Sequence, residues 1–260
     1  DIPFIHQFGL FIEENFTWSM GERDLRIQAG MRFDHASKVG STWSPRFNAS
    51  FDLIPRALTL SGGYGITAKM PTLLYLYPEK AYFEYVNINE LANESIPENE
   101  RLFMTTTKVY DTENRNLKVS KNHKAEIGLR LNVGKVSASV TAFQERLKNG
   151  YSLDYTFDTF NTFMYNEYTR NANGDLILAS SLPVLNSFYT PTNNLNVETQ
   201  GLEFDINIGR LEAIRTAFQL NGAWMRTKSW NDSYHFYDNS GTAASSRKPV
   251  AIYEAGTNKS

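Results

Sequence analysis

Hydrophobic and polar residues alternate with a period of two along several stretches of this chain, most regularly between residues 25 and 34. Successive side chains of a β-strand point to opposite faces, so this stretch is predicted to be a strand. A soluble β-sandwich and a membrane β-barrel both contain such strands. One face of the predicted strand carries Leu25, Ile27, Ala29, Met31 and Phe33, and the other carries Arg26, Gln28, Gly30, Arg32 and Asp34.

The same alternation recurs and predicts an all-β chain, an antiparallel up-and-down meander of about eight strands. Long polar stretches at 69–120 and 149–194 lack this period, and within the first we expect a short helix near 88–92. After residue 227 the chain is polar and aperiodic, with no closing element. The predicted strands span residues 8–18, 25–34, 43–54, 57–68, 121–132, 135–148, 195–208 and 213–228.

The connections between these strands alternate in length. Short turns lie at 20–24, 55–56, 132–134 and 209–213, and long connections lie at 35–42, 69–120, 149–194 and after 227. In an up-and-down sheet, alternate connections fall at opposite ends, so all long loops lie at one end. This asymmetry is typical of outer-membrane barrels and favours a barrel over a sandwich. The alternative is a soluble or surface β-sandwich that binds carbohydrate. The same count puts both chain ends on the long-loop side, from which we expect a segment of a larger barrel.

Composition narrows the function further. The 260 residues include 26 Lys+Arg and 28 Asp+Glu, a net charge of -2 that gives no electrostatic case for binding nucleic acid. The absence of cysteine excludes disulfides, thiolate zinc sites and a thiol nucleophile. No window approaches 18 consecutive apolar residues, whereas barrel strands need only about 9–11 alternating ones.

No residues combine into a catalytic, cofactor or metal site. The four histidines, His6, His35, His123 and His235, are scattered without a carboxylate at ligand spacing. The glycines at 62–65 (GGYG) lie inside a predicted strand and precede no helix, so they indicate close packing rather than phosphate binding. We therefore expect a protein that is not an enzyme.

Several motifs resemble the barrel segments of TonB-dependent outer-membrane receptors, in the style of the Bacteroidota and their SusC-like group. The resemblance covers most of residues 8–228. The motifs are G-x-R-x-D at Gly30, Arg32 and Asp34, S-P-R at 44–46, P-T-L at 71–73, E-I-G-L at 126–129 and Q-G-L-E at 200–203.

The resemblance implies a 22-stranded barrel in the outer membrane of a Gram-negative bacterium, plugged by an N-terminal domain. Such receptors import bulky, scarce nutrients such as siderophores, cobalamin, glycans or peptides with energy delivered through TonB. The implied partners are outer-membrane lipid, the plug domain of the same full-length chain and TonB through an N-terminal part. A surface lipoprotein is a further candidate partner. We expect the plug domain, the TonB-contacting segment and the terminal aromatic strand to be absent from these 260 residues.

Two sets of candidate site residues follow from this resemblance. The charged residues of the polar strand faces would line the lumen and contact the plug, or form a merely hydrated wall. The loop aromatics would stack on ligand, or pack the loops on themselves. The first set is Arg26, Arg32, Asp34, Arg46, Asp52, Glu126, Arg130, Glu203 and Asp205, and the second is Tyr75, Tyr77, Tyr82, Tyr85, Tyr155 and Tyr165.

Overall fold

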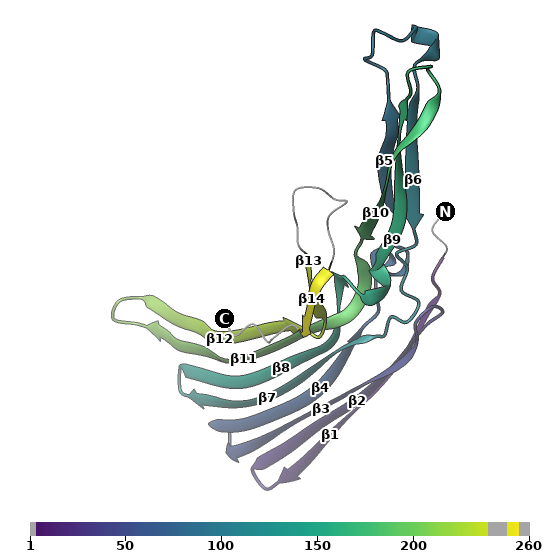
Figure 1. The fold of residues 1–260 in the computed structure, drawn as a ribbon. Coiled ribbons are helices and arrows are strands. Elements are labelled where there is room, and N and C mark those ends of the chain that lie inside the picture. Colours follow the sequence, from purple (N-terminus) through teal and green to yellow (C-terminus); the bar gives the residue numbers. More distant parts are fainter. Residues whose placement is uncertain (1–3, 239–248, 255–260) are drawn as a thin grey trace.

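The structure, a computed structural model, describes residues 4–238 and 249–254, with side chains up to residue 233. Eight strands form one antiparallel sheet in the order β1-β2-β3-β4-β7-β8-β11-β12 (Figure 1). The predicted all-β meander is confirmed, and each strand overlaps one predicted stretch. The strands are β1 (Gln7–Met20), β2 (Arg23–Ala36), β3 (Gly40–Ile54), β4 (Leu58–Lys69), β7 (Ser120–Val133), β8 (Val136–Asp154), β11 (Thr190–Leu211) and β12 (Thr216–Asn231).

Four tight turns, which follow β1, β3, β7 and β11, share a backbone feature. Each contains a residue with positive φ, namely Gly21, Arg56, Gly134 or Arg215. Positive φ at the tip matches the right-handed twist of the flanking strands, which lets so few residues reverse the chain. These turns lie together at one end of the sheet. The opposite end, from which the connections after β4 and β8 leave, is called the outer end below. The long connection expected at 35–42 is wrong, because β2 and β3 pair as far as Ala36 and Gly40 and only residues 37–39 join them.

The long connections are structured, which corrects the expectation of aperiodic loops. The first contains helix α1 (Leu73–Leu76), the 3-10 turn η1 (Glu98–Glu100) and a hairpin of β5 (Ala81–Asn89) with β6 (Phe103–Tyr110). The second contains the 3-10 turn η2 (Phe157–Thr159) and a hairpin of β9 (Phe160–Arg170) with β10 (Leu176–Ser187).

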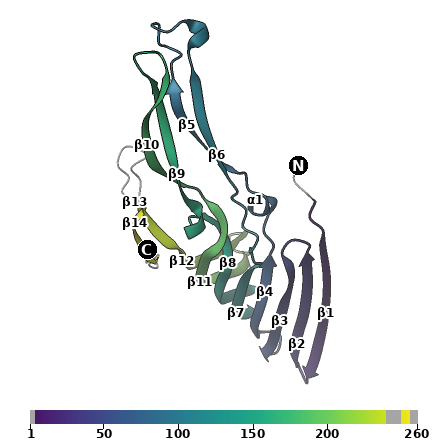
Figure 2. The ribbon, with the colours of Figure 1, turned by 45° about the vertical axis from the view of Figure 1, so that its right-hand side comes forward.

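Together β5, β6, β9 and β10 form an arm that rises from the outer end (Figures 1 and 2). The two hairpins pack against each other along β5 and β9. The helix expected near 88–92 is wrong, because Ile88 and Asn89 belong to β5 and the helical turn lies at Leu73–Leu76 instead. Ile88 is buried within the arm as part of this strand.

The tail of the chain also carries structure that the sequence pattern did not predict. Strand β12 continues to Asn231, and β13 (Tyr234–Asp238) pairs antiparallel with β14 (Pro249–Glu254). The expectation of an aperiodic tail is therefore wrong for these two strands. Among the described residues, no helix is long and apolar enough to cross a membrane.

The buried apolar side chains gather at the outer end and in the arm rather than between two sheets. They are few among the described residues, and they include Ala36, Leu76, Leu117, Val119 and Val184. No second sheet of the described residues covers the apolar face of the eight-stranded sheet, where Ile127 is 58% exposed. The sheet is thus a single curved layer, which does not favour the sandwich alternative.

Candidate functional site

The strand register places all nine predicted charged residues on the same face of the sheet, called the polar face. Cross-strand partners share a face, and side chains two residues apart in one strand share it too. The register joins Gly30 to Arg46, Arg46 to Gly65 and Gly65 to Lys124, which carries the polar face from β2 to β7. Across the remaining strands it continues through Arg130, Ser139 and Asp205. The set on this face is Arg26, Arg32, Asp34, Arg46, Asp52, Glu126, Arg130, Glu203 and Asp205.

A polar network connects the lower part of this face across β2, β3 and β4. Arg26 Nη2 donates to Asp24 Oδ2 at 2.9 Å and to Asp52 Oδ2 at 3.1 Å. Thr59 Oγ1 donates to the other oxygen of Asp52 at 2.9 Å. A further hydrogen bond links β2 to β1, with Gln28 Nε2 donating to the carboxylate oxygen Oε1 of Glu13 at 2.9 Å. These bonds fix the charged side chains against the wall of the sheet.

A cavity of about 670 Å³ lies on the polar face closer to the outer end. Its lining includes Arg32, Asp34, Arg46 and Lys69. Arg32 forms a two-pronged pair with Asp34, with Nε at 2.8 Å from Oδ2 and Nη2 at 2.9 Å from Oδ1. Ser44 also lines this cavity, and its buried hydroxyl has no hydrogen-bond partner in the structure. The cavity is therefore a polar recess with spare hydrogen-bonding capacity.

Beyond β4 the polar face carries a second set of ion pairs. Lys124 Nζ lies 3.1 Å from Glu126 Oε2 and 3.7 Å from Glu145 Oε1. Gln219 Nε2 donates to Asp205 Oδ2 at 2.9 Å. These exposed pairs contribute little to stability. What they create is a hydrated surface with charges of both signs.

The opposite face, called the apolar face, carries a band of exposed hydrophobic side chains that crosses the strands obliquely. On β3 the band ends toward the outer end at Trp43, and on β12 it ends at Trp224. Following the register from Trp224 leads to Ala49 on β3, six residues below Trp43. Six residues at about 3.3 Å, set against five strand spacings of about 4.8 Å, correspond to a strand tilt of about 40°. Membrane barrels tilt their strands by about 35–45°, so the band has the geometry of a lipid-facing surface.

The arm has an interior of aromatic and amide side chains. Tyr85 lies 5.0 Å from Phe163 and 5.5 Å from Tyr165, measured between ring centroids. The Tyr85 hydroxyl donates to the buried Asn186, and Asn186 Nδ2 donates to the Tyr110 hydroxyl at 3.0 Å. Burial raises the pKa of Tyr85. Tyr85 and Tyr165 thus pack the two hairpins together, the second of the two roles considered for the loop aromatics.

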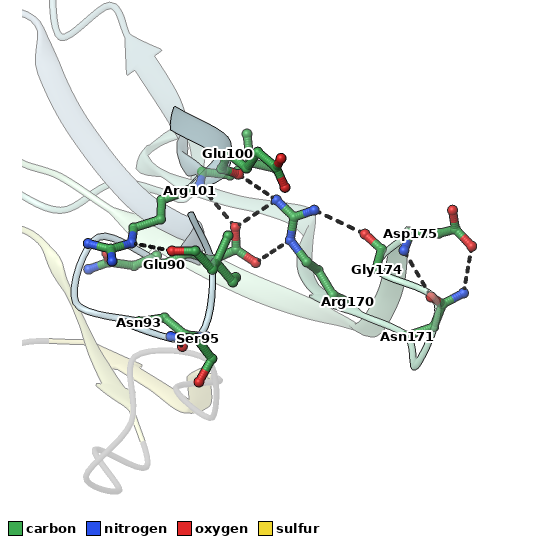
Figure 3. A network of polar contacts seen from close by, with 12 residues as sticks. Glu90, Asn93, Ser95, Glu100, Arg101, Arg170, Asn171, Gly174 and Asp175 are labelled. Carbon is green, nitrogen blue, oxygen red and sulfur yellow. Dashed lines mark hydrogen bonds and ion pairs between the residues drawn. The ribbon is translucent and has the colours of Figure 1, made fainter. Parts of the chain in front are cut away.

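An ion pair joins the hairpins near the tip of the arm (Figure 3). Arg170 Nε donates to Glu90 Oε1 at 2.8 Å and Nη2 donates to Glu90 Oε2 at 3.0 Å. Arg170 also reaches the carbonyl oxygens of Glu100 at 2.7 Å and Gly174 at 3.0 Å. The Glu90 side chain is only 9% exposed, and the hydrogen bond from Arg170 lowers its pKa.

The other candidate aromatics lie around the base of the arm. Tyr75 packs on Tyr151 at 5.2 Å between centroids, and Tyr155 packs on Tyr189 at 4.2 Å. Tyr77 lines a cavity of about 480 Å³. Of the six predicted aromatics, Tyr82 is 67% exposed on the outside of β5.

Sequence reasoning missed the residues that hold the arm together. These residues belong to no periodic pattern, and only their contacts in the folded structure show a role. They are Glu90, Arg170, Asn87 and Asn186. Asn87 Nδ2, for example, donates to the Asn166 carbonyl oxygen at 2.6 Å, 79 residues away. Within the part of the chain that the structure describes, no three His, Asp or Glu residues converge as a metal site.

Comparisons with known proteins agree with this geometry. A protein family described as TonB dependent receptor-like, beta-barrel, matches residues 4–255. The ferric enterobactin receptor of Pseudomonas aeruginosa PAO1 is 30% identical over 142 residues, which are 55% of this chain and 17% of that receptor.

Three solved structures share the fold at low identity. The siderophore receptor PirA of Acinetobacter baumannii has a TM-score of 0.55 and 22% identity, over 85% of this chain and 27% of that one. The outer membrane transporter YddB of Escherichia coli gives 0.56 and 16%, over 86% and 25%. The RagAB peptide transporter gives 0.54 and 14%, over 97% and 25%.

The chain therefore spans between 17% and 27% of the length of these four proteins. The family match extends over nearly all of its length and agrees with the tilted, two-faced sheet described above. This chain belongs to the TonB-dependent receptor-like β-barrel family, whose members lie in the outer membrane of Gram-negative bacteria.

Proposed function

We propose that this chain is a barrel section of an outer-membrane importer that takes up a bulky, scarce nutrient with energy delivered through TonB. The observation that carries the proposal is the pairing of an oblique apolar face with a polar face of ion-paired charges. The free edges of β1 and β12 in the described sheet are satisfied by further strands of the same barrel. The family contains receptors and transporters, and we propose no catalytic role for this chain.

The polar face is proposed to contact the plug domain of the intact receptor. Its ion pairs hold charges of both signs at fixed positions. Such a surface suits a partner that binds and leaves better than it suits permanent burial in a hydrophobic core. The recess beside Arg32, with the unpartnered hydroxyl of Ser44, is the part of this face with hydrogen-bonding capacity to spare.

The arm is proposed to form part of the outer vestibule through which ligand arrives. The ring contacts of Tyr85 and Tyr165 support a role in internal packing, whereas the exposure of Tyr82 suits ligand stacking. Siderophores and peptides are the ligand classes that the names of the similar proteins suggest. A surface lipoprotein partner remains a prediction.

Uptake by cells tests this function. A strain without the intact receptor, complemented by it, would be supplied with labelled ferric siderophores and labelled peptides in parallel. We expect uptake of one ligand class that requires both the receptor and TonB. Equal uptake in the receptor-deficient strain, or uptake that persists without TonB, would overturn the proposal.

A substitution then separates ligand contact from arm structure. Tyr82→Ala is expected to weaken ligand binding while leaving the arm folded, and Glu84→Ala, also on the outside of β5, serves as its control. If the Tyr82→Ala variant binds ligand as well as the Glu84→Ala variant does, the proposed ligand contact of Tyr82 is wrong.

A further inference from the structure

The apolar face becomes strongly basic directly above its hydrophobic band on β7, β8, β11 and β12. The register puts these basic residues on the same face as Ile127 and Trp224, between two and six residues farther toward the outer end. We call the set the basic patch, and it consists of Lys121, Arg146, Lys148, Arg226 and Lys228.

The charges of this patch are poorly compensated within the protein. Lys121 stands directly opposite Lys148 across β7 and β8, and like charges facing each other in a sheet are destabilising. On the apolar face of the four segments 121–125, 144–148, 196–200 and 226–230, Glu198 is the one acidic residue. It is shared between Arg146 Nη2 at 3.3 Å and Gln144 Nε2 at 2.7 Å.

The patch is local and is not a uniform ring of charge. On β1, β2 and β3 the hydrophobic band extends further toward the outer end. The next outward positions there are Phe8, His35 and Ser41, which pair with one another across the strands. None of these is a lysine or an arginine, so the excess of positive charge is confined to β7, β8, β11 and β12.

We propose that the basic patch binds the phosphate groups of a phosphorylated lipid in the outer leaflet of the membrane. Lysine and arginine bind phosphate through charge-assisted hydrogen bonds, and an anion between Lys121 and Lys148 relieves their repulsion. A lipid fits better than a free anion, because acyl chains attached to the phosphates would extend along the same face onto Ile127, Leu202 and Trp224. This inference rests on the outer-membrane location and not on the transport proposed above.

A lipid-binding titration tests the proposal on the intact receptor in nonionic detergent. Purified lipid A would be titrated and the bound lipid counted by native mass spectrometry, with dephosphorylated lipid A in a parallel arm. The test variant is Lys121→Gln with Lys148→Gln. The control is Lys135→Gln with Arg210→Gln, two exposed cations at the tight-turn end, which both lie near Glu212.

Removing two patch charges is expected to weaken lipid A binding about 30-fold, whereas the control binds as the wild type does. Lys121→Arg with Lys148→Arg keeps the charge and should keep the binding. Three results overturn the proposal: equal binding by the test and control variants, equal binding of dephosphorylated lipid A, or displacement of the lipid by equimolar inorganic phosphate. Ligand uptake measured in the same variants reports on transport separately.

Discussion

Leu129 provides a direct test of which face of the sheet meets lipid. Its side chain lies on the apolar face, in the middle of the band that β7 contributes with Ile127, Leu131 and Val133. The next residue, Arg130, points to the polar face. An arginine at position 129 would therefore place its charge in hydrocarbon, whereas the charge of the neighbouring Arg130 lies in water.

The depth of Leu129 sets the size of the effect. Arginine at the middle of a bilayer costs a barrel about 2–4 kcal/mol, and close to the interface only about 0–1 kcal/mol. Leu129→Arg should thus lower the ratio of folded to unfolded receptor about 30- to 900-fold. Ala125→Arg is the matched control, since Ala125 lies on the same face of β7 but level with Gln144, where the band ends. Its expected cost is at most about 1 kcal/mol.

The assay is denaturant unfolding of the intact receptor in lipid vesicles, followed by the mobility difference between heated and unheated samples on a gel. Arg130→Leu completes the series, and as a change on the hydrated face it should shift stability by about 0.5 kcal/mol or less. If Leu129→Arg proved as stable as Ala125→Arg, the apolar face would not be in hydrocarbon and the membrane assignment would fall.

Three further predictions concern the arm and the packing between strands. The lowered pKa of Glu90 means that its contribution to arm stability is complete above the ordinary value of 4.5 and is lost as the pH falls through the lowered value. Hydrogen exchange at the tip of the arm, corrected for its intrinsic pH dependence, should therefore accelerate in acid. The Glu90→Gln variant should exchange fast already at neutral pH, and the Glu84→Gln variant should behave as the wild type does. Tyr85→Phe leaves buried Asn186 without one donor and should cost about 1–3 kcal/mol in thermal unfolding of the arm, against no change for Tyr82→Phe. Gly201→Val should cost about 1–3 kcal/mol, because a Cβ there lies 2.6 Å from the Trp224 carbonyl oxygen, whereas Gly62→Ala, with its nearest contact at 3.5 Å, should be tolerated.

The two faces of the sheet were predictable because strand geometry translates directly into a period of two. Arg26, Arg32 and Asp52 could be assigned to one face from spacing alone, and the register confirms that they share it. Spacing could not indicate that Arg26 would pair with Asp52 on the next strand, since that depends on which strands become neighbours and on how far each is shifted.

The arm escaped prediction for a physical reason. Its hairpins turn polar residues such as Asn87, Asn186 and Arg170 toward each other. The inner faces of the hairpins therefore leave no alternating hydrophobic pattern in the sequence. The pairing of Glu90 with Arg170 spans 80 residues, and no local pattern reports a contact at that separation. The helix expected near 88–92 failed at the same place, because the burial of Ile88 comes from β5 lying against the other hairpin.

The Glu90–Arg170 pair also bears on the order in which the protein assembles. Each hairpin of the arm can form by itself, since β5 pairs with β6 and β9 with β10 over short separations. Strands β7 and β8 lie between the two hairpins in the chain, and closing so long a loop is slow. We expect the arm to lock only after the sheet beneath it has formed. During pulsed refolding, the strands should become protected from hydrogen exchange before the tip does, and simultaneous protection would contradict this order.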